Sequence, residues 1–94
     1  MNESKIKIKV FGYVQGVFFR YTTRKFARNL GLTGYVKNMP DETVYIEAEG
    51  PKDKLNELLE FSKRGPKHAQ VEKVEYEYSL PTNEFKGFDY MIEY

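Results

Sequence analysis

The sequence contains no cysteine, no tryptophan and a single histidine, His68. The absence of cysteine excludes disulfides, thiolate metal sites and a cysteine nucleophile, and it agrees with a reducing compartment. The single histidine follows a helix stop in the segment GPKHAQ, offers no convincing Ser–His–Asp set and is expected to lie in an exposed loop. No group of residues has metal-ligand spacing, so we expect neither a metal site nor a cofactor.

Long apolar runs are also missing. The N-terminal segment MNESKIKIKV alternates charged residues with isoleucine, which fits neither a signal peptide nor a membrane span. We therefore expect a cytoplasmic protein that is not inserted in a membrane. The chain has 94 residues, of which 40% are hydrophobic and 16% aromatic. Residues 1–94 are accordingly expected to form a single domain with a small core.

The net charge of +1 hides an uneven distribution along the chain. Residues 1–37 carry 8 Lys or Arg and one acid, whereas residues 38–94 carry 7 Lys or Arg and 13 acids. The positive half suggests an anionic partner, which would be a nucleic acid, a membrane surface or a small phosphate compound. A second interpretation stays open for Lys5, Lys7 and Lys9, since they alternate with apolar residues and fit the wet side of a strand.

The spacing of apolar residues predicts the elements of the first half. Residues 5–10 alternate between charged and apolar and indicate a strand with one dry face. After a glycine-containing loop, apolar positions recur at helical spacing in Phe19, Thr23, Phe26, Ala27 and Leu30. Residues 35–39 and 44–48 are then typical of a hairpin, joined by a turn at residues 40–42.

The second half predicts a helix followed by two strands. Pro51 fits the first turn of a helix, whose buried stripe is Leu55, Leu58, Leu59 and Ser62. Gly65 and Pro66 end this helix. Residues 71–78 indicate a fourth strand with an irregularity between Val71 and Val74. The segment PTNEFKG is expected to be a loop, and FDYMIEY a fifth strand or an extension of the sheet.

The resulting order, β-α-β-β-α-β plus a terminal strand, indicates an α+β fold of the ferredoxin-like split βαβ type. Such a fold has an antiparallel sheet with two helices on one face. The lysine side of the first strand is then expected to face solvent. A solvated sheet face is also the expected place of the acids that alternate with apolar or aromatic residues, which are Glu47, Glu49, Glu75 and Glu77.

The junction between the first strand and the first helix could hold an anion. A helix N-terminus offers unpaired backbone N–H groups and the positive end of the helix dipole. Gly16 allows a tight turn of the backbone, and Arg20 could grip two oxygens of a phosphate or a carboxylate. The pattern lacks the GK[ST] ending of a Walker A loop. From these residues alone, a glycine turn followed by a surface arginine is therefore the favoured interpretation, and the anion site is the alternative.

Asn38 is the second polar candidate. It lies near the end of a predicted strand, just before Met-Pro-Asp, where an asparagine is usually a turn residue. A functional role would require it to lie beside the loop that carries Arg20. In a split βαβ fold this proximity is compatible with the topology, but the sequence does not establish it.

Two motifs resemble the acylphosphatase family. The family's first motif, G-x-V-Q-G-V-x-F-R, corresponds to residues 12–20, with every fixed position filled. The second, G-x-V-x-N followed after a short turn by V-x-x-x-x-E-G, corresponds to residues 34–38 and 44–50. The resemblance covers nearly the whole chain. Only the residues around 82–86 depart from it, as a longer loop before the last strand.

This resemblance implies the ferredoxin-like fold and hydrolysis of the carboxyl–phosphate bond of acyl phosphates. It implies that Arg20 binds the substrate phosphate and that Asn38 positions the attacking water. It also implies that the backbone N–H groups of the preceding loop bind the phosphate; these belong to Gln15, Gly16, Val17, Phe18 and Phe19. We accordingly expect a monomer whose partner is a small acyl phosphate, and neither a nucleic acid nor a membrane.

Two other functions compete with hydrolysis. Small split βαβ domains often bind RNA through aromatic residues on their sheets, and the basic half and 8 tyrosines of this chain fit that pattern. However, the RNP1 motif is missing, and RNA binding would leave the glycine loop without a role. A regulatory protein that binds an anion without turnover is the other alternative.

Overall fold

The computed structural model describes residues 3–91 and confirms the predicted order of elements. The elements are β1 (Glu3–Tyr13), α1 (Phe19–Asn29), β2 (Thr33–Asn38), β3 (Val44–Pro51), α2 (Lys52–Arg64), β4 (Gln70–Ser79) and β5 (Phe88–Tyr90). Pro51 ends β3 and is the N-cap of α2 rather than part of its first turn. Of the predicted last strand, residues 92–94 lie outside the described part of the chain.

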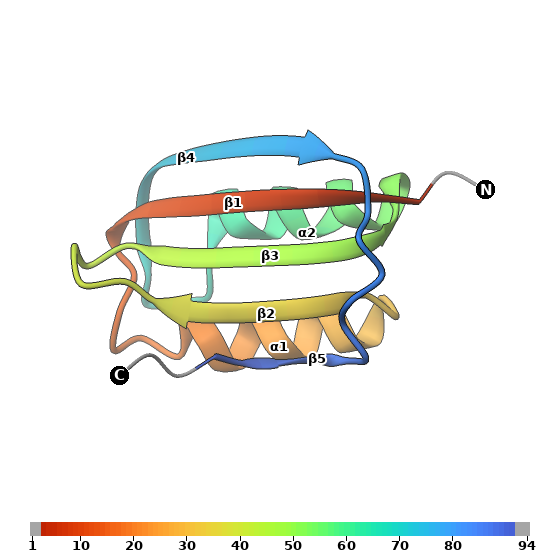
Figure 1. Ribbon diagram of the computed structural model, residues 1–94. Coiled ribbons are helices and arrows are strands. Elements are labelled where there is room, and N and C mark those ends of the chain that lie inside the picture. Colours follow the sequence, from red (N-terminus) through yellow and green to blue (C-terminus); the bar gives the residue numbers. More distant parts are fainter. Residues whose placement is uncertain (1–2, 92–94) are drawn as a thin grey trace.

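The five strands form one mixed sheet in the order β4-β1-β3-β2-β5 (Figure 1). The pairings of β1 with β3 and β4, and of β2 with β3, are antiparallel as predicted. β5 instead pairs parallel to β2. The reason is visible in Figure 1: the chain crosses from β4 to the opposite edge, and β5 starts at the same end of the sheet as β2.

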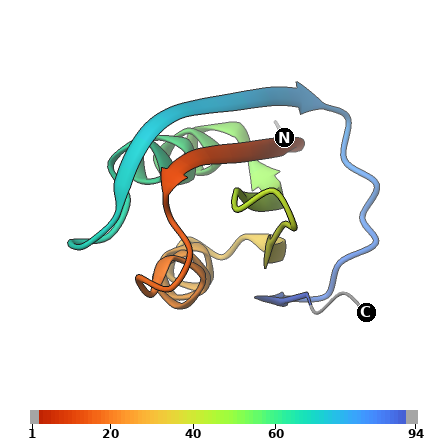
Figure 2. The same cartoon turned by 90° about the vertical axis from the view of Figure 1, so that its left-hand side faces the viewer.

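Both helices cover one face of the sheet, as predicted (Figure 2). The core between them contains the apolar side of β1 and β3 and the predicted stripe of α2. The helical spacing did not predict that Phe61 belongs to the core. It is buried and stacks on Phe26 with 4.9 Å between the ring centroids. Of the helices in residues 3–91, neither is long and apolar enough to span a membrane.

The irregularity predicted in the fourth strand is a shift in the pairing of β1 with β4, next to Gly12. The φ angle of Gly12 is +132°, and a Cβ built there would lie 2.1 Å from the carbonyl oxygen of Gln70. Only glycine can occupy this position without moving the neighbouring strand. The shift lies at the end of β1 from which the loop to α1 departs.

The other face of the sheet is partly covered by residues 80–87, the crossing segment, which runs from β4 to β5 (Figures 1 and 2). It buries Lys5 and Glu49 and leaves Glu47 only partly accessible. The prediction of a solvated face is therefore wrong for these three residues. It is correct for Lys7 and for Glu75 and Glu77 of β4, which are exposed.

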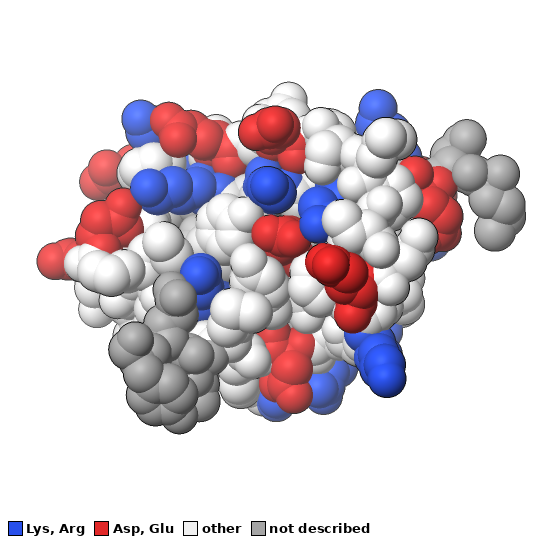
Figure 3. Space-filling view, in the orientation of Figure 1, with Lys and Arg blue, Asp and Glu red and all other residues white. Residues whose placement is uncertain are grey.

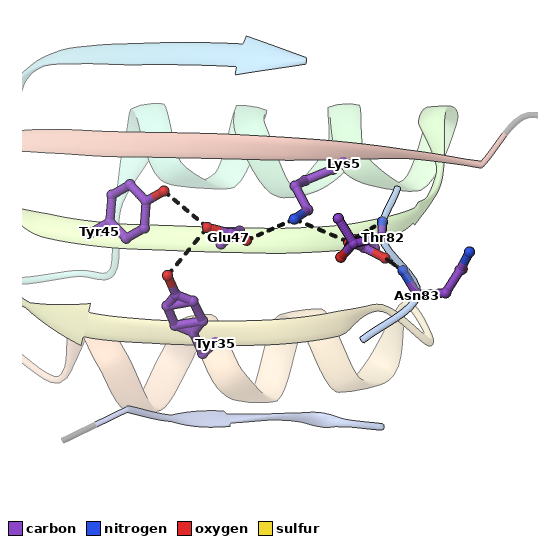
Figure 4. Close-up of polar contacts among 7 residues, drawn as sticks. Lys5, Tyr35, Tyr45, Glu47, Thr82 and Asn83 are labelled. Carbon is purple, nitrogen blue, oxygen red and sulfur yellow. Dashed lines mark hydrogen bonds and ion pairs between the residues drawn. The ribbon is translucent and has the colours of Figure 1, made fainter. Parts of the chain in front are cut away.

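An ion cluster lies under the crossing segment (Figure 4). Lys5 Nζ lies 3.0 Å from Glu47 Oε2 and 3.3 Å from Glu49 Oε2. The backbone N–H groups of Thr82 and Asn83 both donate to the Glu49 carboxylate over 2.9 Å. Glu49 therefore forms an ion pair with a lysine of β1 and accepts hydrogen bonds from two amides of the crossing segment. These contacts fix that segment to the sheet.

Opposite charges face each other across the strands of this sheet. Lys5 is paired in register with Glu49, and Lys7 with Glu47 on one side and Glu77 on the other. Positive and negative groups are accordingly interspersed on this face of the molecule (Figure 3). The positive half of the sequence does not produce a positive sheet face, because acids from the other half lie beside its lysines.

The ion cluster is expected to make stability depend on pH at both extremes. Burial alone would raise the pKa of Glu49, but hydrogen bonds from Thr82 and Asn83 and the Lys5 ammonium lower it overall. Its stabilisation is thus present above the ordinary pKa of about 4.5 and is lost as the pH falls through the lowered value. Burial alone would lower the pKa of Lys5, yet both glutamates raise it overall. The stabilisation that the Lys5 ammonium contributes is therefore lost only in strongly alkaline solution.

We predict that Lys5→Met lowers the free energy of unfolding by about 3 kcal/mol at neutral pH, because the buried Glu49 and the half-buried Glu47 lose their cation. Urea unfolding followed by circular dichroism measures this loss. The matched control is Lys7→Met, on the same face of β1 but exposed and without an ion pair among the described residues, which should change stability little. The variant lacks the ammonium that lowers the pKa of both glutamates, so they take up protons at a higher pH than in the parent protein. The penalty of Lys5→Met should therefore shrink as the pH falls toward 4, and an undiminished penalty would contradict this account.

Candidate active site

A cavity of about 330 Å³ opens where β1 leads into α1, beside the end of β2. In Figure 1 this is the left-hand end of the sheet, where the arrowhead of β2 lies. Its lining consists of Val14, Gly16, Phe18, Phe19, Arg20, Tyr21, Asn38 and Tyr90. The two polar residues selected from the sequence, Arg20 and Asn38, thus lie at one cavity although 18 positions separate them in the chain.

The loop before α1 turns through two left-handed residues. Gly16 has φ +75° and Phe18 has φ 62° and ψ 22°. No side chain caps α1, and the first backbone bond into the helix runs from the Thr22 N–H to the Phe18 carbonyl over 3.0 Å. The amides of residues 19–21 therefore lack partners within the helix. They are hydrogen-bond donors at the positive end of the helix dipole.

Arg20 adds a positive charge to this end of α1. The first turn contains no acidic residue, so the guanidinium and the helix dipole are not neutralised locally. Among residues 3–91, Arg20 forms no ion pair, and its guanidinium lies 5.8 Å from the centroid of the Tyr90 ring. Arg24, one turn later, pairs with Asp89 over 3.1 Å. The first of these arginines is thus the one left available for an external anion.

Asn38 is the last residue of β2. Its Oδ1 is buried and has no hydrogen-bond partner in the described part of the chain. The turn that follows is held instead by Asp41, whose Oδ1 accepts bonds from the Thr43 backbone N–H (3.1 Å) and hydroxyl (2.5 Å). These bonds from Thr43, together with the Lys9 ammonium, lower the pKa of Asp41 to about 2. The turn thus keeps its own side-chain bonds, and the amide of Asn38 takes no part in them.

The side chain of Gln15 connects the loop to the hairpin turn next to Asn38. Its Nε2 donates to the carbonyl oxygens of Met39 and Thr43, each over 2.9 Å. Val17 points into the core and is 6% exposed. Neither side chain lines the cavity, so any contribution of these two residues to a ligand would come from their backbone. Gln15 instead joins the two polar sides of the cavity.

The sequence did not identify Tyr21 or Tyr90 as cavity residues. One feature of the sequence could have indicated Tyr21: it follows Arg20 in the first turn of a helix that begins at the loop. No local feature of the sequence could have indicated Tyr90, because it reaches the cavity only through the crossing segment and the pairing of β5 with Val36 of β2.

The sequence and the fold are both similar to those of one known protein family. The family model described as acylphosphatase matches residues 6–90. The chain is 48% identical to the acylphosphatase of Caldivirga maquilingensis over 85 residues, 89% of this chain and 90% of that protein. It is 44% identical to that of Thermotoga maritima over 90 residues, 95% of this chain and 96% of that protein. The crystal structure of an acylphosphatase from Bacillus subtilis superposes with a TM-score of 0.91 at 34% identity, covering 95% and 99% of the two chains.

We predict that Gln15→Ala weakens the binding of inorganic phosphate by about tenfold, because the loop loses both bonds to the hairpin turn. Isothermal titration calorimetry with phosphate measures the affinity. Gln70→Ala, an exposed position in β4, is the matched control and should bind phosphate like the parent protein. Equal affinities of both variants would show that the tether does not order the loop.

Proposed function

We propose, since this chain belongs to the acylphosphatase family, that it hydrolyses the carboxyl–phosphate bond of acyl phosphates in the cavity between Arg20 and Asn38. The observation that carries the proposal is the meeting of three features at one cavity. They are an arginine without an ion pair among the described residues, a helix N-terminus with unpaired amides, and an asparagine oxygen that is buried without a partner.

The phosphoryl group binds between the loop and Arg20. The N–H groups of residues 15–19 donate to its oxygens, and the guanidinium takes two of them side by side. The dianion offsets the local excess of positive charge at the start of α1. In phosphoryl transfer, catalysis depends mainly on positioning and on stabilising the charge of the phosphoryl oxygens, and this set of donors supplies both.

The attacking water is held by the amide of Asn38. An amide both accepts and donates hydrogen bonds, so it fixes a water in line with the bond that breaks. It is not a base at neutral pH. The residues that line the cavity within the described part of the chain include no Asp, Glu or His. We therefore assign no enzyme group as a general base.

The chemistry balances without such a base. The water oxygen forms a bond to phosphorus, and the bond between phosphorus and the carboxyl oxygen breaks. The carboxylate leaves with the bonding electron pair, so no strong acid is needed to protonate it. One proton of the water passes to an oxygen of the transferred phosphoryl group. The products are a carboxylate and dihydrogen phosphate.

The competing functions have less support. Binding of RNA on the sheet would need an open, positive face, yet the crossing segment covers part of that face and its charges are mixed. A single assay distinguishes hydrolysis from binding of an anion without turnover. It measures the release of phosphate from benzoyl phosphate. Both Arg20 and Asn38 come from one chain, so the proposed reaction needs no second subunit.

We predict that Arg20→Lys abolishes phosphate binding and turnover, with a loss of about 100-fold or more, because lysine lacks the planar fork. Hydrolysis of benzoyl phosphate and its inhibition by inorganic phosphate measure both effects. Arg64→Lys, at the exposed end of α2, is the matched control and should behave like the parent protein. Hydrolysis by Arg20→Lys at the parent rate would rule out two-point binding by the guanidinium.

We predict that Asn38→Ala lowers kcat by about 100-fold or more with a smaller change in KM, since the lost group positions water and not the phosphate. Steady-state kinetics with benzoyl phosphate separates the two constants. Asn29→Ala, at the exposed end of α1, is the control. A raised KM with unchanged kcat would assign Asn38 to substrate binding instead.

A further inference from the structure

Aromatic side chains surround the phosphate site on the side that faces solvent. Phe18 and Tyr21 line the cavity, and their exposed fractions are 75% and 50%. Tyr90 lines it as well and is half-buried. Arg20 is the only charged residue among the described residues of the lining. A ligand whose phosphate is held by Arg20 therefore meets mainly aromatic surface with the rest of its atoms.

Phe18 occupies a position that the fold alone does not explain. A non-glycine residue in the left-handed region is unfavourable, and a bulky apolar side chain that is 75% exposed gains little from burial. Asparagine or glycine would suit this backbone better. Residues held in such conformations tend to lie at functional sites. The ring is therefore placed to contact something other than the protein core.

Tyr90 is held firmly beside the phosphate site. The guanidinium of Arg24 stacks on its ring with 4.2 Å to the centroid, and that of Arg20 lies at 5.8 Å. Arg24 is itself fixed by its ion pair with Asp89, the neighbour of Tyr90 in β5. The ring thus forms part of the cavity wall, in contact with Arg24 and next to Arg20.

We propose that Phe18, Tyr21 and Tyr90 bind the acyl group of the substrate and select acyl phosphates with aromatic or large apolar acyl groups over acetyl phosphate. This inference rests on the hydrolysis proposed above. The cavity of about 330 Å³ lies within the usual range of small-molecule sites, about 300–1,000 Å³, and a phosphate fills only part of it. A negatively charged acyl group would compete with the phosphate for Arg20.

The test compares kcat/KM for benzoyl phosphate and acetyl phosphate, and uses the ratio as its readout. Phe18→Ala and Tyr90→Leu should each lower the benzoyl-to-acetyl ratio, roughly threefold to tenfold, because a ring contact is lost. Tyr90→Phe keeps the ring and should keep the ratio. Tyr76→Leu removes a tyrosine that is 51% exposed on β4, away from the cavity, and serves as the matched control.

The outcomes separate this inference from the proposed function. A lower ratio in Phe18→Ala and Tyr90→Leu, with the parent ratio in Tyr90→Phe and Tyr76→Leu, supports the acyl-binding role. If Tyr90 only supported Arg20, both substrates would lose the same factor and the ratio would not move. An unchanged ratio in both cavity variants overturns the inference while leaving hydrolysis intact. A parent protein that hydrolyses neither substrate overturns both.

Discussion

The candidate site depends on the positive charge that is concentrated at the start of α1. The unpaired N–H groups, the N-terminal end of the helix dipole and the Arg20 guanidinium all present positive charge. No acidic residue of the first turn balances this charge. The surrounding structure holds this arrangement in place. Gly12 allows the strand shift from which the loop departs, and Gln15 fixes the loop to the hairpin turn. In the proposed reaction, the substrate phosphate would supply the negative charge that the first turn of α1 lacks.

A second structural constraint acts on the opposite face of the sheet. Glu49 neutralises Lys5 and accepts the amides of Thr82 and Asn83, so the crossing segment is fixed to β3 (Figure 4). This segment delivers β5 to the edge beyond β2, and Tyr90 of β5 reaches the cavity. The buried ion cluster therefore contributes to the shape of a site at the other end of the sheet, without contacting it.

Local patterns predicted the elements well, because each reports a preference that acts over a few residues. Alternation in β1 and the leucine spacing of α2 both proved correct, and so did the irregularity near Val71. The errors concern residues whose surroundings come from far along the chain. Lys5 and Glu49 alternate like solvated residues, but a segment more than 30 positions after Glu49 covers them.

The sequence by itself determined the order of elements, and it singled out the glycine loop, Arg20 and Asn38 as candidates, since composition and short-range spacing encode these features. Only the tertiary structure decided that Arg20 and Asn38 line one cavity, that β5 runs parallel to β2, and that Tyr90 joins them. The physical reason is that strand pairing brings together residues without any local signal of their meeting. Register and crossing direction depend on the energy of the whole sheet, which no single segment specifies.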